Sequence, residues 1–400
     1  MANQTITAPL GFRVAAVKAG IKTSGNLDLG LIVADHPCAA AATFTTNKIF
    51  GAAVGVTREH IRSGQARAVF VNAGNANTCT GPRGDRDARK ICQEVARLAD
   101  IKPKAVLICS TGIIGHYLPM TKVLCGITQA TSRLSRSVKS GNNFARAIMT
   151  TDTKPKMAYR KIKLNGKTVQ IAGTTKGSGM IAPNMATMLA FITTDASIST
   201  PMLRRAHKRA VYSTFNKVTI DNHMSTSDTA IVLASGAADN HKITTADPNY
   251  EKFSSALTQV CDDLALQLAA DGEGAHCTII IRVKGAATAR DARLAVRAIS
   301  DSPLVKTAFY GNDPNWGRII SAIGYSGAKF HNQKLKCTIA GTCVFRNGQP
   351  CLFDPASLST KMKAKKWSVD VDLGCGSHQD FCYTCDLSRE YVTINADYHT

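Results

Sequence analysis

The sequence predicts a mixed α/β protein in which helices pack against sheets. Strand-like and helical segments alternate along the first half of the chain. A hairpin pattern is centred on Asn165-Gly166, where apolar and polar residues alternate on both sides of a dipeptide that suits a type I′ turn. A long amphipathic segment, 250–270, precedes a β-rich segment, 277–283. These two segments predict a helix followed by a strand.

The remaining elements follow from the same periodicities. Short apolar runs predict buried strands at 29–34, 68–72 and 105–109. Helical spacing of apolar residues predicts helices at 88–99, 201–213 and 291–300. Alternation in Tyr391-Val-Thr-Ile394 predicts a last strand near the end of the chain.

Size and composition are those of a globular protein. The chain has 400 residues, of which 44% are hydrophobic and 19% charged, and its length favours two or three domains. It has no apolar run of the roughly 18–20 residues that cross a bilayer, and its first residues do not resemble a secretory signal. Its 13 cysteines are spread irregularly, which favours free thiols in a reducing compartment. We therefore expect a cytoplasmic protein without a membrane segment.

The net charge of +21 raises the question of nucleic-acid binding. The basic residues are scattered, however, and the two densest groups, 204–209 and 361–366, are not interleaved with aromatic residues. They are typical of a solvated helix face and a solvated loop or helix start. We expect no nucleic-acid partner; an acidic substrate would suit the positive field.

Thr187 is the candidate that carries most of the chemistry. From the residues alone, it could be a core threonine in an apolar segment that follows a Gly/Ser turn. If the Ala186–Thr187 peptide bond were cut, however, Thr187 would carry a hydroxyl beside a free α-amine. The pKa of such an amine is about 7.7–8.0, so the amine can act as the general base that activates the hydroxyl.

The string KGSGMIAPNMATML, residues 176–189, resembles the self-cleavage segment of the ornithine acetyltransferase family. Matching motifs run from Gly11-Phe12 to Thr400. The resemblance implies a layered αββα fold shared with the DmpA-type aminopeptidases. It also implies autocleavage into an α chain, 1–186, and a β chain, 187–400, with two of each in the working particle.

The same resemblance implies a reaction. Thr187 would take the acetyl group of N-acetylornithine and pass it to glutamate, in arginine biosynthesis, without a metal or an organic cofactor. Acetyl-CoA as a second acetyl donor stays open. The alternative is an aminopeptidase or amidase of the same fold, which would release its acyl group to water.

Ser110-Thr-Gly-Ile-Ile-Gly115 follows a predicted buried strand. It could be an ordinary glycine turn, or a loop that aims donors at an oxyanion. It is similar to the family's STGxIG element, which implies that Thr111 and Gly112 form the oxyanion hole.

The family also implies a set of substrate-binding residues. Lys176, otherwise a solvated lysine, would pair with a substrate carboxylate. Thr150 is the favoured residue in the run 150–153, where Thr151 and Thr153 are rivals and a helix cap is the alternative.

Two further elements complete the substrate set. Glu273 lies in a DGEGA motif, whose glycines could equally cap a helix. The family continues this motif with Thr-Lys, whereas this chain has His276-Cys277. The last residues, otherwise frayed, would fold into the pocket with Asn395 and Thr400, so an extended C-terminus should lower activity.

Two segments leave questions open. In 221–229 the chain departs from the family at Asn222, His223, Met224 and Ser227, which could shift substrate preference. Zinc ligands are suggested by four residues near the end of the chain, Cys375, His378, Cys382 and Cys385. The spacing of Cys382 and Cys385 fits a zinc site, but the second ligand pair with matching spacing is missing.

Overall fold

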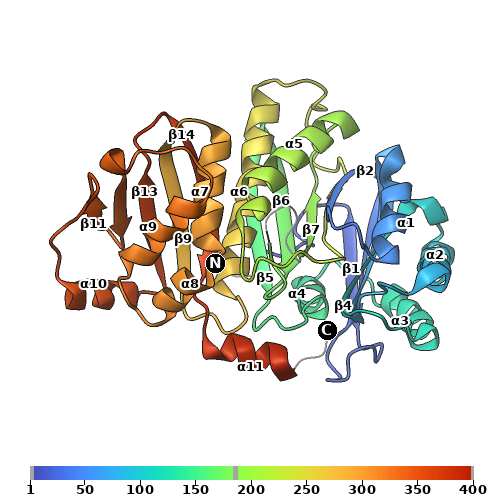
Figure 1. Cartoon of the computed structure of the whole chain (residues 1–400). Helices are drawn as coiled ribbons and strands as arrows, with labels where there is room; N and C mark the ends of the chain where they lie inside the picture. Colours follow the sequence, from blue (N-terminus) through green and yellow to red (C-terminus); the bar gives the residue numbers. More distant parts are fainter. Residues whose placement is uncertain (1–3, 183–187, 398–400) are drawn as a thin grey trace. The chain divides into compact units, whose positions relative to one another are not determined.

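The computed structural model describes residues 4–182 and 188–397 (Figure 1). Its contacts divide the chain into two compact units. Unit 1 comprises Met1–Asn216 and His223–Leu268, and unit 2 comprises Lys217–Asn222 and Ala269–His399.

Unit 1 is built on an eight-stranded sheet with the order β4-β3-β2-β8-β7-β6-β5, and β1 pairs with β2 outside this path. The β3–β4 and β7–β8 pairs are parallel and the others antiparallel. Its strands are β1 (Phe12–Val17), β2 (Leu29–Phe44), β3 (Gln65–Asn75), β4 (Val106–Ile113), β5 (Lys156–Leu164), β6 (Lys167–Lys176), β7 (Leu189–Thr194) and β8 (Thr229–Ala234).

The long strand β2 turns this sheet into two layers. Its first part, 29–33, pairs with β3, its last part, 39–44, pairs with β8, and the register shifts between Val33 and Cys38. Side chains from both halves of the sheet, such as Val69 of β3 and Phe191 of β7, belong to one buried core. The two halves therefore face each other across that core, as in a sandwich.

Helices cover the outer faces of unit 1, as Figure 1 shows. One core on the β1–β4 side contains residues of α1 (Ala52–His60), α2 (Gly81–Ala99) and α3 (Met120–Ser132). On the other side lie α5 (Thr200–Ser213) and α6 (Pro248–Ala270), and a Cβ on Gly173 of β6 would touch Leu264 of α6. The layers run helix, sheet, sheet, helix, which confirms the predicted αββα arrangement.

Helix α4 (Val138–Ala147) closes one end of this sandwich. It contacts β1, and the ring of Phe144 lies edge-on to that of Phe191, with 5.4 Å between centroids.

Short 3-10 turns occur in both units, at η1 (Ile61–Ser63), η2 (Pro103–Ala105), η3 (Phe215–Lys217) and η4 (Asn332–Lys334).

Unit 2 holds a six-stranded sheet with the order β12-β11-β10-β13-β9-β14. Its strands are β9 (Thr278–Ala286), β10 (Lys336–Ile339), β11 (Thr342–Arg346), β12 (Gln349–Pro350), β13 (Lys366–Asp372) and β14 (His378–Cys385). The apolar face of this sheet shares a core with α7 (Ala289–Ser300), α8 (Pro303–Tyr310) and α9 (Trp316–Tyr325). Helices α10 (Pro355–Met362) and α11 (Arg389–Asp397) complete the unit.

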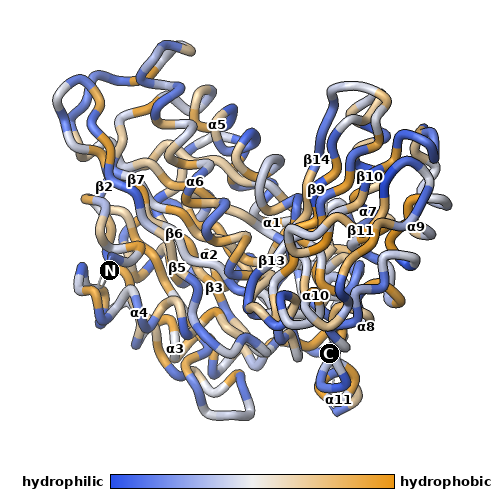
Figure 2. The backbone as a smooth tube through the Cα atoms, turned by 90° about the vertical axis from the view of Figure 1, so that its left-hand side faces the viewer, coloured by the Kyte–Doolittle hydropathy of each residue, from blue (hydrophilic) through white to orange (hydrophobic). Residues whose placement is uncertain are grey.

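The tube in Figure 2 carries orange segments along the strands and blue in many of the outer loops. Strands β7 and β8 of unit 1 are buried along their whole length, as expected where a sheet is covered on both faces. The predicted hairpin is confirmed, because Asn165 (φ 45) and Gly166 (φ 80) take the two positive φ values of a type I′ turn. In the described part of the chain, no helix has both the length and the apolar character to span a bilayer.

The predicted strand at 391–394 is wrong, because these residues lie in α11. The side chain of Ser388 accepts the backbone N–H of Tyr391 at 3.2 Å and caps the first turn. No strand pairs with this segment within the described residues, so its β-branched residues have no ladder to join.

Candidate active site

Thr111 and Gly112 lie at the end of β4, beside the end of the parallel strand β3. Gly112 has φ +130, and a Cβ there would collide with the backbone of Gly74 and Asn75. Only glycine therefore allows the two strand ends to approach so closely. Thr111 is buried, with 4% of its surface exposed.

Asparagine side chains hold these two strand ends together. Asn72 accepts the hydroxyl of Ser110 at 2.7 Å. The Nδ2 group of Asn75 donates to the carbonyls of His116 and Tyr117, at 3.2 Å each. The loop that carries Thr111 is thus fixed by neutral hydrogen bonds, as a set of preorganised donors requires.

Lys176 is the last residue of β6 and is 3% exposed. Its ammonium donates to Oγ1 of Thr111 at 3.4 Å. The next residue, Gly177, donates its backbone N–H to Oδ1 of Asp152 at 2.7 Å. The structure therefore brings Thr111 and Lys176 together and adds Asp152 beside them.

Asp152 forms a fully buried ion pair with Lys156, with 2.6 Å between Nζ and Oδ1. Burial alone would raise the pKa of Asp152, but the charges of Lys156 and Lys176 outweigh it and lower that pKa to about 2. Lys22 is a third cation in this region. Burial lowers its pKa to about 8, and the neighbouring charge of Lys176 acts in the same direction.

Sequence reasoning missed Asp152, Lys156 and Lys22 as parts of this cluster. Asp152 lies inside the run of threonines at 150–153, where its acidic side chain was the available signal. Nothing in the local pattern marks Lys156 or Lys22, since both look like ordinary solvated lysines. The burial of Lys156 and the partial burial of Lys22 are properties of the tertiary structure.

Thr150 is half-buried, and its backbone N–H donates to Oδ2 of Asp152 at 2.9 Å. Its rival Thr151 forms a hydrogen bond of 2.7 Å with the hydroxyl of Ser178, at the start of the predicted cleavage segment. The alternative of a helix cap is wrong here, because the next element is the strand β5.

Ala186 and Thr187 lie outside the described residues, and the chain resumes at Met188. The backbone N–H of Met188 donates to Oδ1 of Asp228 at 3.1 Å. Asp228 is 1% exposed, and burial raises its pKa well above the ordinary value. Sequence analysis did not select this residue, although it is among the matching positions of 221–229.

Glu273 and Asn395 lie in unit 2. Glu273 is in the predicted loop between α6 and β9 and is 9% exposed. Nδ2 of Asn395, on α11, donates to Oε2 of Glu273 at 2.8 Å. The structure thus joins these two predicted substrate residues, while Thr400 lies outside the described residues.

The unusual His276-Cys277 pair surrounds a buried carboxylate, Asp386. The backbone N–H groups of His276 and Cys277 donate to Oδ1 of Asp386 at 2.8 and 3.1 Å. Nδ1 of His276 lies 3.1 Å from Oδ2. The two residues therefore contribute to the structure of the loop that carries Glu273.

The departures in 221–229 have structural roles in both units. In unit 2, Asn222 accepts the guanidinium of Arg297 at 2.8 Å. In unit 1, the carbonyl of Met224 accepts Nδ2 of Asn47 at 3.2 Å.

The zinc ligands that the sequence suggests lie on or near β14. Cys382 and Cys385 are buried on β14, and the described residues contain no group of three or more His, Cys, Asp or Glu side chains placed to hold a metal ion.

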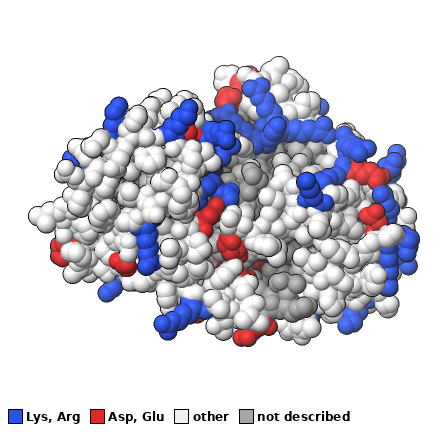
Figure 3. All heavy atoms as spheres, in the orientation of Figure 1, with Lys and Arg blue, Asp and Glu red and all other residues white. Residues whose placement is uncertain are grey.

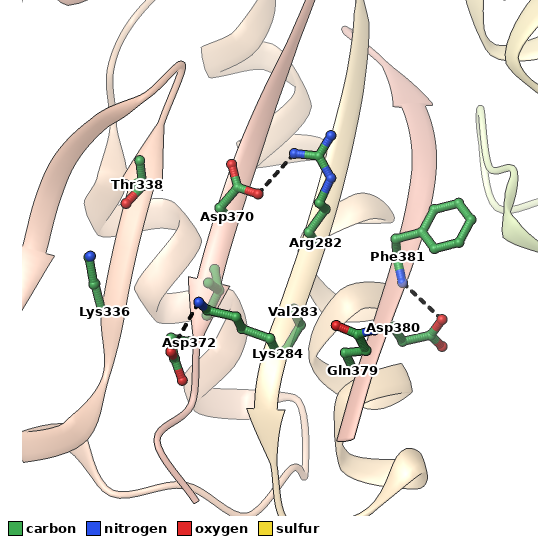
Figure 4. Close-up of a pocket in the computed structure, with 11 residues that line it drawn as sticks. Arg282, Val283, Lys284, Lys336, Thr338, Asp370, Asp372, Gln379, Asp380 and Phe381 are labelled. Atoms are coloured by element: carbon green, nitrogen blue, oxygen red, sulfur yellow. Dashed lines mark hydrogen bonds and ion pairs between the residues drawn. The ribbon is translucent and has the colours of Figure 1, made fainter. Parts of the chain in front are cut away.

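A cavity of about 640 Å³ lies on the polar face of the unit 2 sheet (Figure 4). Two ion pairs cross from β9 to β13 in its lining. Arg282 lies 3.0 Å from Asp370, and Lys284 lies 3.6 Å from Asp372. The cavity contains none of the predicted site residues.

The ArgJ family model matches residues 13–400. The chain belongs to the ArgJ family. It is 43% identical over 397 residues to the arginine biosynthesis bifunctional protein ArgJ of Symbiobacterium thermophilum, covering 99% of this chain and 98% of the relative. Identity to the Lactococcus lactis protein of the same name is 44% over 394 residues, with 98% of each covered.

A solved structure supports the same assignment. The crystal structure of the ArgJ protein of Bacillus halodurans is 39% identical, with a TM-score of 0.50. The aligned region covers 52% of this chain and 97% of the Bacillus halodurans chain. This member of the ArgJ family is therefore an enzyme, as the sequence predicted.

Proposed function

We propose that this ArgJ protein cuts itself between Ala186 and Thr187 and then transfers an acetyl group from N-acetylornithine to glutamate through acetyl-Thr187, in arginine biosynthesis. The family assignment supports the pathway, since the relatives are named bifunctional proteins of arginine biosynthesis. The observation that carries the proposal is the contact between Lys176 and Thr111, because it joins the start of the cleavage segment to the predicted oxyanion hole.

The strand register supports a reactive centre at this place. Leu189 pairs with Lys176 where β7 lies beside β6. Position 187 is two residues from Leu189 along the chain. The nucleophile is thus tied by covalent geometry to the strand whose last side chain reaches Thr111.

Maturation would proceed through an ester. The Thr187 hydroxyl attacks the carbonyl carbon of Ala186, the C–N bond breaks, and the nitrogen becomes the α-amine of Thr187. Water then hydrolyses the ester, giving a carboxylate on Ala186 and returning the hydroxyl. The new amine is the base that the second reaction uses.

Acetyl transfer would also have two halves. The Thr187 hydroxyl attacks the acetyl carbonyl while its proton passes to the α-amine, and Thr111 and Gly112 stabilise the oxyanion. Ornithine leaves with that proton. The α-amine of glutamate then attacks the acetyl ester, and N-acetylglutamate leaves.

The remaining residues would hold the amino-acid parts of both substrates. Lys176 supplies a buried positive charge suited to a carboxylate. Glu273 supplies a carboxylate suited to an ammonium group, together with Asn395. Thr150 and Thr400 would complete the set, and two α and two β chains would form the particle.

The length of the solved relative supports a scission near the middle. Nearly all of the Bacillus halodurans chain, 97%, matches only 52% of this chain. That chain is therefore about half as long as this one, which is the outcome expected of a family whose members are cut once.

The first test uses intact-mass analysis and N-terminal sequencing. The natural protein should give two pieces, with Thr187 at the start of one. Thr187→Ala should remain one chain and be inactive, while Thr187→Ser should still be cut because it keeps a hydroxyl. A cleaved Ala variant would show that another bond is used.

The second test separates transfer from hydrolysis. The mature protein is incubated with N-acetylornithine and isotopically labelled glutamate, and labelled N-acetylglutamate is measured by mass spectrometry. Ping-pong kinetics are expected from a covalent acetyl-enzyme. Rapid release of acetate without labelled product would favour the aminopeptidase or amidase reaction instead. Replacing N-acetylornithine with acetyl-CoA tests the second donor.

A further inference from the structure

Two thiols meet on the outer hairpin of the unit 2 sheet. Cys343 lies in β11, and Cys351 directly follows β12, the strand at the edge of that sheet. Their sulfur atoms are 3.5 Å apart, and both residues are half-buried. Because the sulfurs of a disulfide lie about 2.05 Å apart, a modest rotation of the two side chains would bring these atoms to bonding distance.

A β-bulge explains why these two side chains meet. In the register of the β11–β12 hairpin, Cys351 lies opposite Val344, whose carbonyl accepts its backbone N–H at 3.0 Å. Regular alternation would then point Cys343 to the other face of the sheet. In the pairing of β11 with β10, however, the register shifts at Val344, which is the extra residue. Such a bulge re-aims a neighbouring side chain.

Other partners for these thiols are less favourable. Cys337 of β10 is near Cys343, but it is fully buried in the core of unit 2, so an oxidant in the solvent reaches Cys343 and Cys351 first. A third metal ligand is also missing, because the described part of the chain holds no cluster of three or more His, Cys, Asp or Glu side chains suited to a metal ion.

Proximity, more than acidity, favours a bond between these sulfurs. The pKa of Cys351 is raised, first by partial burial and then by the hydrogen bond with Cys343, while the charges of Arg346 and Lys336 act in the opposite direction. A thiol with a raised pKa attacks slowly, because the thiolate is the nucleophile. Once one of the two cysteines carries a mixed disulfide, however, the other lies beside its sulfur, and an attack within one molecule is strongly favoured.

We propose that Cys343 and Cys351 form a reversible oxidation site that reacts with a low-molecular-weight disulfide, such as oxidised glutathione. The thiolate of one cysteine attacks a glutathione sulfur, the glutathione S–S bond breaks, and the departing thiolate takes up the proton that the cysteine lost. The thiolate of the other cysteine then attacks the protein sulfur of this mixed disulfide. The Cys343–Cys351 bond forms, and the second glutathione leaves with the second proton.

The two steps balance as one exchange. Two cysteine thiols are oxidised to a disulfide, and one glutathione disulfide is reduced to two thiols. An excess of reduced glutathione reverses both steps. The hairpin would therefore return to two free thiols in a reducing compartment and would retain no glutathione after oxidation.

The test treats the full protein, without denaturant, with oxidised glutathione. The remaining thiols are blocked by alkylation, and the peptides are mapped by mass spectrometry without reduction. We expect a bond between Cys343 and Cys351, seen as the loss of two hydrogens from the peptides that carry them. Reduced glutathione should restore both thiols.

Cys125 is the control within the same sample. It is exposed on α3, where its sulfur accepts the side-chain amide of Gln129 at 3.4 Å. Cys125 should retain glutathione as a mixed disulfide, because an amide cannot displace a thiol from it.

Cys343→Ser and Cys351→Ser remove the second thiol in turn. In each variant the remaining cysteine of the pair should retain glutathione, as Cys125 does, because the serine hydroxyl does not complete the exchange. Both positions are half-buried, so both variants should fold, and thermal unfolding checks this.

Four results would overturn the inference. Glutathione that stays on Cys343 or Cys351 of the natural protein would show that the two sulfurs cannot close. Thiols that stay unmodified while Cys125 reacts would show that the hairpin excludes the oxidant. A bond between Cys343 and Cys337 would assign the oxidation to another pair. A Cys343–Cys351 bond that survives reduced glutathione would make the disulfide structural rather than reversible.

Discussion

At the residue scale, the close approach of Gly112 to Gly74 sets the geometry of the predicted oxyanion hole. The two backbones approach at a distance that excludes a Cβ, which explains why a glycine follows Thr111. The local pattern alone could not separate this from an ordinary glycine turn. The distinction comes from β3, which lies some forty residues earlier in the chain and supplies the other backbone.

Gly112→Ala should therefore lower both stability and activity. The positive φ costs about 1–2 kcal/mol for any residue with a Cβ, and the collision with Gly74 adds to this by pushing the strand ends apart. Chemical denaturation and kcat measure the two effects.

Gly115→Ala is the matched control for that substitution. Gly115 has φ +84 and nothing within 4 Å of a Cβ, so only the conformational cost remains. Equal losses of stability and kcat in the two variants would contradict the steric explanation.

At the element scale, α5 was predicted as a basic helix with a solvated face, and one of its residues departs from that picture. His207 is buried, and its Nε2 lies 3.1 Å from the carbonyl oxygen of Ala230 on β8. Burial lowers the pKa of His207 to about 4, from an ordinary value of 6.5. The helix thus packs on the sheet through a neutral imidazole.

This packing predicts a pH-dependent stability. Above pH 6.5 the histidine is neutral in both the folded and the unfolded state, and its packing contributes fully to the free energy of unfolding. As the pH falls from 6.5 to about 4, the unfolded chain binds a proton that the folded protein does not bind. The free energy of unfolding therefore decreases by up to about 3 kcal/mol.

His207→Gln should remove this part of the dependence of the free energy of unfolding on pH, as measured by urea unfolding between pH 7 and pH 4. His241→Gln, at an exposed position, is the control and should keep the slope. A natural slope in the His207 variant would show that other groups cause the decrease.

At the scale of the whole molecule, the predicted scission point falls inside one sheet of unit 1. β6 precedes it and β7 follows it, and these strands are neighbours. β2 and β8 likewise pair across the point. The boundary at 186/187 would therefore be chemical, since the compact units of the chain divide elsewhere.

The two pieces should consequently stay together after cleavage. We expect them to elute as one species in size-exclusion chromatography and to separate only in denaturant, because parting them breaks two strand ladders and the core between the layers. Uncut Thr187→Ala should elute at the same volume. Separation of the pieces in native buffer would contradict this shared sheet.

The charge of +21 also belongs to this scale. Figure 3 shows Lys and Arg gathered over the region of α5 and along the right-hand edge of the visible face. The exposed basic residues of α5 are Arg204, Arg205, Lys208 and Arg209. They line one face of a single helix, as the sequence indicated, and the positive field they add would favour the approach of acidic substrates.

The sequence by itself determined the fold class, the Asn165-Gly166 hairpin and several helices and strands, such as those at 88–99, 250–270 and 277–283, because hydrophobic periodicity and turn chemistry are local. It also singled out Thr111, Gly112 and Lys176 through motifs. It misassigned 391–394, where a capping serine and the lack of a partner strand outweigh β propensity. Only the tertiary structure decided that Asp152, Lys156 and Asp228 are buried around Lys176 and Met188, because burial and pairing depend on residues far apart in the chain.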